Sequence, residues 1–316
     1  MNKLEPEGLK KYTFLSNVLF SEDGEKLGYI VHEPNLDEND YDSNIWIYYI
    51  EDDKNYQLTT SNKDKNFIWL NGEEILFVSE RGKEKKDKKN DRKEKKETNF
   101  FKINVEGGEA KKFDTVNKKV NEIIKKSRTE LILSVKEKIS EEGIPEEENE
   151  KDEEKKIEEG KDYHELDEIP YWANGEGFTN KVRTHIYLYD LEEKELRLLV
   201  GGPKDVQSFD VRENGISLKV NEYTDHMDIV DHLYHYDIQN DILRKLTDEE
   251  LRLGETRFLE DKILFEATDM DKMGINTNME FYLYDLDKDE YEQLTEMDKS
   301  LGNALLTDIQ YGGGKT

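Results

Sequence analysis

One phrase recurs along the chain at nearly constant spacing, and it restricts the fold more than any other feature. It reads IYLYDLEEKELRLL at residues 186–199, LYHYDIQNDILRKL at 233–246 and FYLYDLDKDEYEQL at 281–294. Aligned on their closing apolar residues, these copies and two looser ones end at Ile50, Val105, Leu191, Ile238 and Leu286. The spacings are 55, 86, 47 and 48 residues, so the last two give the period and the first two contain insertions. Such a period indicates a repeat architecture.

Each phrase is typical of two strands joined by a turn. In the third copy, Ile186, Leu188 and Asp190 fall on one face, and Tyr187, Tyr189 and Leu191 fall on the other. Residues 192–194 make the turn, and Leu196 and Leu198 begin the return strand. Another strand pair precedes most copies, at 18–20 and 27–31, 67–70 and 75–78, 208–211 and 216–220, and 256–259 and 263–265.

Four short antiparallel strands in about 47 residues match the blade of a β-propeller. We therefore predict an all-β chain, a β-propeller of five four-stranded blades with the start of a sixth at residues 305–311. No stripes of apolar residues at helical spacing argue for a helical solenoid. A propeller that stops one strand into a blade exposes an open edge. We therefore expect residues 1–316 to be one propeller domain, a fragment of a longer protein, with a tendency to form homo-oligomers.

Composition narrows the function classes. The formal net charge is −28 and 39% of the residues are charged, so a nucleic-acid partner is not expected. No apolar stretch is long enough to span a bilayer, and the N-terminus lacks the apolar region of a signal peptide. The chain has no cysteine, which excludes disulfides, thiolate metal sites and a cysteine nucleophile. We expect a cytoplasmic protein without a membrane partner.

Two charged insertions interrupt the repeat between the second and third strands of their blades. Residues 83–96 carry nine cationic and four anionic side chains, and residues 141–162 carry twelve anionic and four cationic ones. Equivalent loops of neighbouring blades emerge on one face of a propeller. The two insertions are either separate solvated loops or a pair of loops that dock on each other, and in the second case salt should weaken the docking.

Catalytic and metal motifs are incomplete. No serine lies in a Gly-x-Ser-x-Gly sequence, and His164-Glu165 lacks the second histidine of a zinc motif. The C-terminal Gly312-Gly313-Gly314-Lys315-Thr316 lacks the first glycine of a phosphate-binding loop. We therefore expect no catalytic residue, no metal and no cofactor in this chain.

Several stretches resemble known propeller sequences. Phe20 to Leu27 resembles the inner hairpin of TolB-type repeats, and Val105 to Ala110 resembles the outer hairpin of bacterial peptidases of the prolyl oligopeptidase superfamily. The segments 167–172, 175–178 and 184–187 resemble the middle of the propeller in the acylaminoacyl-peptidase and dipeptidyl aminopeptidase branch of that superfamily.

The resemblance implies the N-terminal, seven-bladed propeller of a serine peptidase. A separate α/β-hydrolase domain would carry the Ser-Asp-His triad, so this chain alone should be inactive. The propeller would cap the active site and admit short peptides. Family members use propeller carboxylates or arginines to hold a peptide terminus, and Glu165, Glu168 and Arg183 are the candidates here.

Two other interpretations stay open. The chain could be a TolB-like or WD-repeat-like propeller that binds a protein on one face. It could also be an enzyme with its site in the central channel, although such sites need polar residues that converge from several blades.

Overall fold

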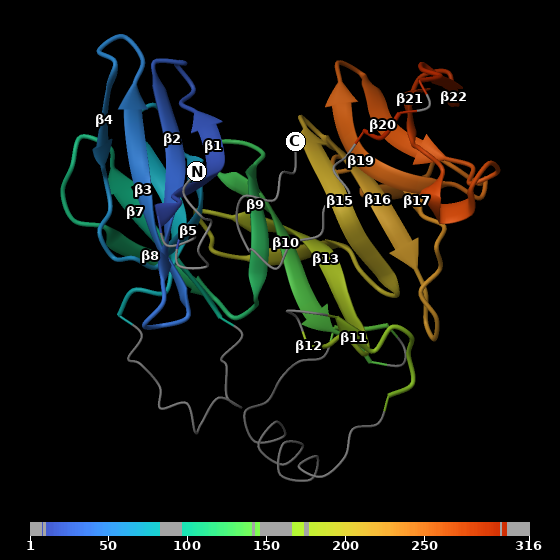
Figure 1. Ribbon diagram of the computed structural model, residues 1–316, viewed down its shortest axis with the longest axis horizontal. Coiled ribbons are helices and arrows are strands. Elements are labelled where there is room, and N and C mark those ends of the chain that lie inside the picture. Colours follow the sequence, from blue (N-terminus) through green and yellow to red (C-terminus); the bar gives the residue numbers. More distant parts are fainter. Residues whose placement is uncertain are drawn as a thin grey trace. The chain divides into compact units, whose positions relative to one another are not determined.

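Alternating apolar side chains and closely spaced turn residues make the strand the preferred local structure along most of this chain. The computed structural model (Figure 1) describes residues 8, 11–82, 97–140, 143–145, 166–173, 177–297 and 299–301. That part contains 22 strands and one short 3₁₀ helix at Gly274–Asn276. The chain divides into two compact units, with the boundary between Arg128 and Thr129.

The first unit contains two complete four-stranded sheets, each an antiparallel meander. Their strand orders are β1-β2-β3-β4 and β5-β6-β7-β8. The strands are β1 (Phe14–Phe20), β2 (Lys26–Asn35), β3 (Asp40–Tyr49), β4 (Lys54–Gln57), β5 (Asp64–Trp69), β6 (Glu74–Ser79), β7 (Thr98–Asn104), β8 (Lys111–Val116) and β9 (Val120–Lys125). This is the blade that the sequence repeat predicts.

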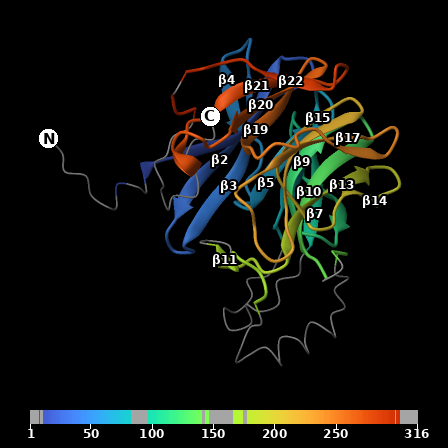
Figure 2. The same ribbon diagram turned by 90° about the vertical axis from the view of Figure 1, so that its right-hand side faces the viewer.

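The second unit repeats the meander and adds a small hairpin. Within this unit the sheet orders are β15-β16-β17-β18, β19-β20-β21-β22, β14-β13-β10 and β11-β12. Figures 1 and 2 show the paired strands β10 and β13 side by side. The strands are β10 (Glu130–Lys138), β11 (Trp172–Ala173), β12 (Gly177–Phe178), β13 (Val182–Asp190), β14 (Leu196–Val200), β15 (Lys204–Arg212), β16 (Gly215–Glu222), β17 (His232–Asp237), β18 (Ile242–Lys245), β19 (Arg252–Leu259), β20 (Lys262–Thr268), β21 (Glu280–Asp285) and β22 (Glu290–Gln293).

Apolar side chains from neighbouring sheets form the core of each unit. In the first unit, β2, β3, β5, β6 and β7 contribute to one buried cluster; in the second, β17, β19, β20 and β21 contribute to another. Gly28 in β2 permits close packing against β5, because a Cβ there would lie 2.6 Å from the Phe67 ring and 3.3 Å from the Trp69 ring. Burial of these faces is the main stabilising term for a stack of sheets.

The recurring phrase encodes a hairpin turn. Its aspartate accepts two backbone N–H groups: Asp190 Oδ1 from Glu192 and Glu193 at 2.8 and 2.9 Å, with equivalent bonds at Asp237 and Asp285. The residue four positions later has positive φ in all three copies, at Lys194, Asp241 and Asp289. Asp241 and Asp289 also accept the hydroxyl of a tyrosine from the phrase. The repeat is therefore a repeat of turn chemistry.

The observed sheets confirm the predicted all-β class and four-stranded antiparallel units. The sequence pattern did not identify β9 and β10, the first two strands of the third sequence repeat. The charged run 83–96 lies between β6 and β7 in the chain, and 141–162 falls between β10 and β13. Three stretches lie outside the described residues: all of 83–96, 141–162 apart from 143–145, and the predicted start of a sixth blade at 305–311. A single propeller domain over 1–316 stays a prediction.

Candidate functional site

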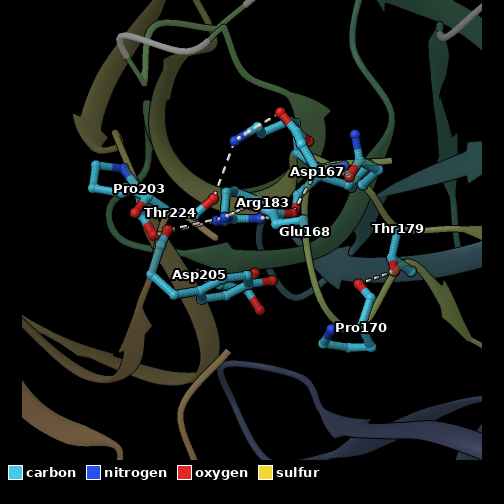
Figure 3. Close-up of polar contacts among 12 residues, drawn as sticks. Asp167, Glu168, Pro170, Thr179, Arg183, Pro203, Asp205 and Thr224 are labelled. Atoms are coloured by element: carbon cyan, nitrogen blue, oxygen red, sulfur yellow. Dashed lines mark hydrogen bonds and ion pairs between the residues drawn. The ribbon is translucent and has the colours of Figure 1, made fainter. Parts of the chain in front are cut away.

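The segment that precedes β13 contains two of the three predicted site residues. Its backbone joins the loop after β16: Ile169 N donates to the Asp225 carbonyl at 2.9 Å, and Met227 N donates to the Ile169 carbonyl at 2.8 Å. Thr179 then closes the β11–β12 hairpin, with its backbone N bound to the Tyr171 carbonyl and its Oγ1 to the Pro170 carbonyl, both at 2.9 Å (Figure 3). The segment is thus held at both ends.

Arg183, near the start of β13, is completely buried, and acceptors surround its guanidinium. Nη1 donates to Glu168 Oε2 at 3.2 Å, and Nη2 donates to Glu168 Oε1 (Figure 3). The other three N–H groups bind the carbonyls of Val182 at 2.9 Å, Pro203 at 3.2 Å and Tyr223 at 2.9 Å. All five donors of the side chain are therefore satisfied inside the protein.

The carboxylate of Glu168 has no exposed surface either. Besides the two bonds from Arg183, it accepts the backbone N–H of Lys181 at 2.7 Å. A two-point arginine–carboxylate contact of this kind is geometrically specific and strong. A single unpaired charge in this place would be costly, so each partner depends on the other.

Two further side chains surround the ion pair. The Tyr223 ring lies 3.6 Å from Cζ of Arg183, a cation–π contact, and burial raises the pKa of Tyr223 to about 12. Asp205 accepts the backbone N–H of Thr184 at 2.8 Å. Burial raises the pKa of Asp205, while its bond to Thr184 and the positive charge of Arg183 act in the opposite direction.

The structure thus brings Glu168 and Arg183 together but turns them toward each other. Glu165 lies outside the described residues. That Glu165, Glu168 or Arg183 holds a peptide terminus stays a prediction, and the observed geometry gives Glu168 and Arg183 a positioning role at the base of the hairpin. Asp205 and Tyr223 carry no sequence signal, because they come from β15 and the loop after β16, where Asp205 binds the backbone of Thr184 and Tyr223 contacts Arg183.

A second buried cluster lies on the paired strands β10 and β13. His185 Nδ1 lies 2.8 Å from Glu137 Oε1, and Tyr187 donates its hydroxyl to the same oxygen at 2.5 Å. His185 Nε2 faces the carbonyl of Gly202 at 3.0 Å, so this nitrogen carries a proton. Burial and the bond to Glu137 raise the pKa of Tyr187. The cluster is enclosed, and its arrangement fits a structural role.

The first unit contains a serine–histidine contact that the sequence motifs did not indicate. Ser16 Oγ lies 2.6 Å from His32 Nε2, and Ser43 Oγ lies 2.7 Å from His32 Nδ1. Burial lowers the pKa of His32 to about 4, with a smaller contribution from the charge of Lys65. Both ring nitrogens of His32 thus face serine hydroxyls, and an imidazole with this pKa is a weak base.

Within the described ranges, no group of three or more His, Asp or Glu side chains is arranged to hold a metal ion. No helix in the part of the chain that the structure describes is long and apolar enough to cross a membrane.

No protein-family model and no curated protein matches the chain. Among solved structures, an acylaminoacyl peptidase from Pyrococcus horikoshii matches at 15% identity and a TM-score of 0.63, over 93% of this chain and 41% of that one. A prolyl endopeptidase structure matches at 10% identity and a TM-score of 0.54, over 93% of this chain and 38% of that one.

An oligogalacturonate lyase in complex with manganese also matches, at 12% identity and a TM-score of 0.56, over 90% of this chain and 67% of that one. These likenesses show the fold, a β-propeller. This chain spans about two fifths of the length of the two peptidases.

Proposed function

We propose that this chain is the non-catalytic β-propeller of a serine peptidase of the acylaminoacyl-peptidase or oligopeptidase type, where it caps the active site and admits short peptides. The observation that carries the proposal is the match of 93% of the chain to the acylaminoacyl peptidase fold at a TM-score of 0.63. The sequence resemblance of the segments 167–172, 175–178 and 184–187 to the same branch also supports it.

In this proposal the propeller and the hydrolase domain have different roles. Acyl transfer needs a serine activated by histidine and oriented by aspartate, and the missing hydrolase domain would supply all three. This chain would supply exclusion by size, and its net charge of −28 would attract cationic peptides. The hydrolase domain and short peptides are its proposed partners, and a cytoplasmic location stays a prediction.

The first test is the coding sequence beyond Thr316. We expect further four-stranded repeats followed by Gly-x-Ser-x-Gly. A stop codon after a sixth or seventh repeat would contradict the peptidase proposal.

The second test is enzymatic and uses the full-length protein. Deletion of the whole propeller, residues 1–316 together with the repeats expected after them, should allow the hydrolase domain to cleave an unfolded protein nearly as well as a short acylated peptide. Activity of the deleted enzyme on a small ester would show that it is folded. Unchanged discrimination between the two substrates would argue against gating.

A second candidate function is a propeller that serves as a protein-interaction module. The exposed aromatic side chains of the β11–β12 hairpin favour it, with Trp172 55% and Phe178 47% exposed. Loss of a bound partner after substitution of these residues, in a chain without a hydrolase domain, would support this function.

A further inference from the structure

Four large apolar side chains project from the hairpin segment of the second unit. We call them the aromatic arm: Ile169, Tyr171, Trp172 and Phe178, which are 60, 49, 55 and 47% exposed. The arm belongs to β11, β12 and the residues just before them, close to the start of β13 (Figure 1). Single exposed apolar residues are ordinary on a protein surface, whereas a group of large ones in one segment indicates a binding surface.

The arm is held in place. Trp172 and Phe178 are cross-strand partners, and their rings contact each other edge to face with centroids 5.1 Å apart. Glu168, which directly precedes Ile169 in the chain, is fixed by its buried ion pair with Arg183. A surface whose side chains are already ordered loses less entropy on binding, which favours affinity.

Three of the polar residues near the arm are exposed aspartates, and the exposed His226 also lies there, bridged to Ile169. Asp167, Asp225 and Asp228 are exposed, and Asp225 is hydrogen-bonded through its carbonyl to Ile169. The nearby cations are turned inward. Arg183 is fully buried, and the Lys181 side chain is 14% exposed, 3.5 Å from Asp167 and bonded to the Thr224 carbonyl at 3.1 Å.

We propose that the aromatic arm docks a basic peptide segment that carries apolar side chains, such as an exposed segment of a partner protein. The apolar side chains would pack on Trp172 and Phe178, and the cationic ones would lie near Asp167, Asp225 and Asp228. A second copy of this chain is disfavoured as the occupant, because each copy carries a net charge of −28. The proposal holds whether the chain caps a peptidase or acts as an interaction module.

The test uses the 316-residue chain and two short labelled peptides, one alternating Lys with Leu and the other Glu with Leu. We expect the Lys-Leu peptide to bind and to shield Trp172 from acrylamide quenching, and the Glu-Leu peptide not to bind. The double variant W172A/F178A should weaken binding about tenfold, equivalent to about 1.4 kcal/mol. Asp225→Asn with Asp228→Asn should weaken it by a smaller factor and reduce its salt dependence.

Matched controls distinguish binding at the aromatic arm from non-specific binding elsewhere on the surface. Phe20→Ala removes another exposed aromatic ring, in β1, and Asp248→Asn removes another exposed carboxylate; both should leave binding unchanged. Unchanged melting temperatures would show that the variants are folded, and Tyr171→Ala serves as a milder variant if the double one is not. Three results would overturn the proposal. The Glu-Leu peptide could bind as well as the Lys-Leu peptide, or the arm variants could bind with the wild-type affinity. The chain could also form dimers that W172A/F178A abolishes.

Discussion

The guanidinium of Arg183 illustrates how a single residue can organise a segment. Its five N–H groups bind Glu168 and three backbone carbonyls that come from β13, the turn before β15 and the loop after β16. Lysine could not replace it, because an ammonium group has three donors and no planar fork. At the residue scale, the segment around the aromatic arm therefore depends on one buried charge pair.

Arg183→Met should destabilise the protein by about 3–5 kcal/mol, because it leaves the Glu168 carboxylate buried without its counter-ion. Adding Glu168→Gln to that variant should recover part of the loss, since the uncompensated charge is then gone. The measurement is the free energy of unfolding in urea for the two single variants and the double one.

Arg197 offers the matched control for this prediction. Its ion pair with Asp241 has a similar separation, 3.3 Å, but the two side chains are 48 and 69% exposed. Arg197→Met should therefore change the free energy of unfolding by only about 0–1 kcal/mol. An Arg183→Met variant as stable as Arg197→Met would mean that the buried pair contributes no more than a surface one.

At the scale of the elements, the unit that recurs is the hairpin turn between the third and fourth strands of a sheet. In the β13–β14 turn, Lys194 N also donates to the Asp190 carbonyl at 3.0 Å. Lys194 has a φ of 59°, which costs energy for a residue with a side chain. The aspartate and the left-handed residue four positions later together fix the direction of the return strand.

Asp190→Ala should destabilise the protein by about 1 kcal/mol, because two backbone N–H groups lose their acceptor. Lys194→Gly should act in the opposite direction and stabilise by roughly 0.5 kcal/mol, since glycine adopts positive φ without strain. Urea unfolding of both variants, and of Glu193→Gly as a control, measures the effects.

Glu193 is the appropriate control because it lies in the same turn but is not among the residues with positive φ. Glycine there should destabilise, as it adds freedom to the unfolded chain and removes no strain. If the two glycine variants changed stability in the same direction, the turn explanation of the repeat would fail.

At the scale of the whole molecule, charge is the dominant property. The net charge of −28 is spread over a chain in which 39% of the residues are charged. Such an excess keeps a protein soluble and opposes the compact state by self-repulsion. The exposed apolar residues of β1, such as Phe20 at 67%, act in the other direction, and the formation of homo-oligomers stays a prediction.

Salt should therefore stabilise this protein at low ionic strength. Between about 0.01 and 0.1 M salt the Debye length falls from roughly 30 to roughly 10 Å, which screens the repulsion more than the close ion pairs. We expect the melting temperature to rise over this range, measured at fixed pH by circular dichroism. A melting temperature that falls with salt would show instead that ion pairs contribute more to stability than the net charge does. Binding of a basic peptide to the aromatic arm should weaken over the same range of salt concentration.

The strands and turns of this fold could be predicted from the sequence because their causes are local. Alternation in Ile186–Leu191, the turn aspartates and the spacing of the copies depend on neighbours within a few residues. The strand β10 showed no such pattern, because it is buried on both faces, with Leu131, Ile132 and Leu133 all at 0% exposure, and a continuous apolar run does not reveal its period.

Only part of the candidate site could be predicted from the sequence. The family resemblance marked Glu168 and Arg183 as candidates for holding a peptide terminus, but it did not pair them. Which partners they meet depends on the approach of Pro203 and Tyr223, 20 and 40 residues farther along the chain. The contact of Ser16 with His32 and that of Glu137 with His185 likewise require strand register, which only the packed sheets set. Local chemistry thus determined the elements, and tertiary packing decided which side chains became buried pairs and which, like Trp172, stayed at the surface.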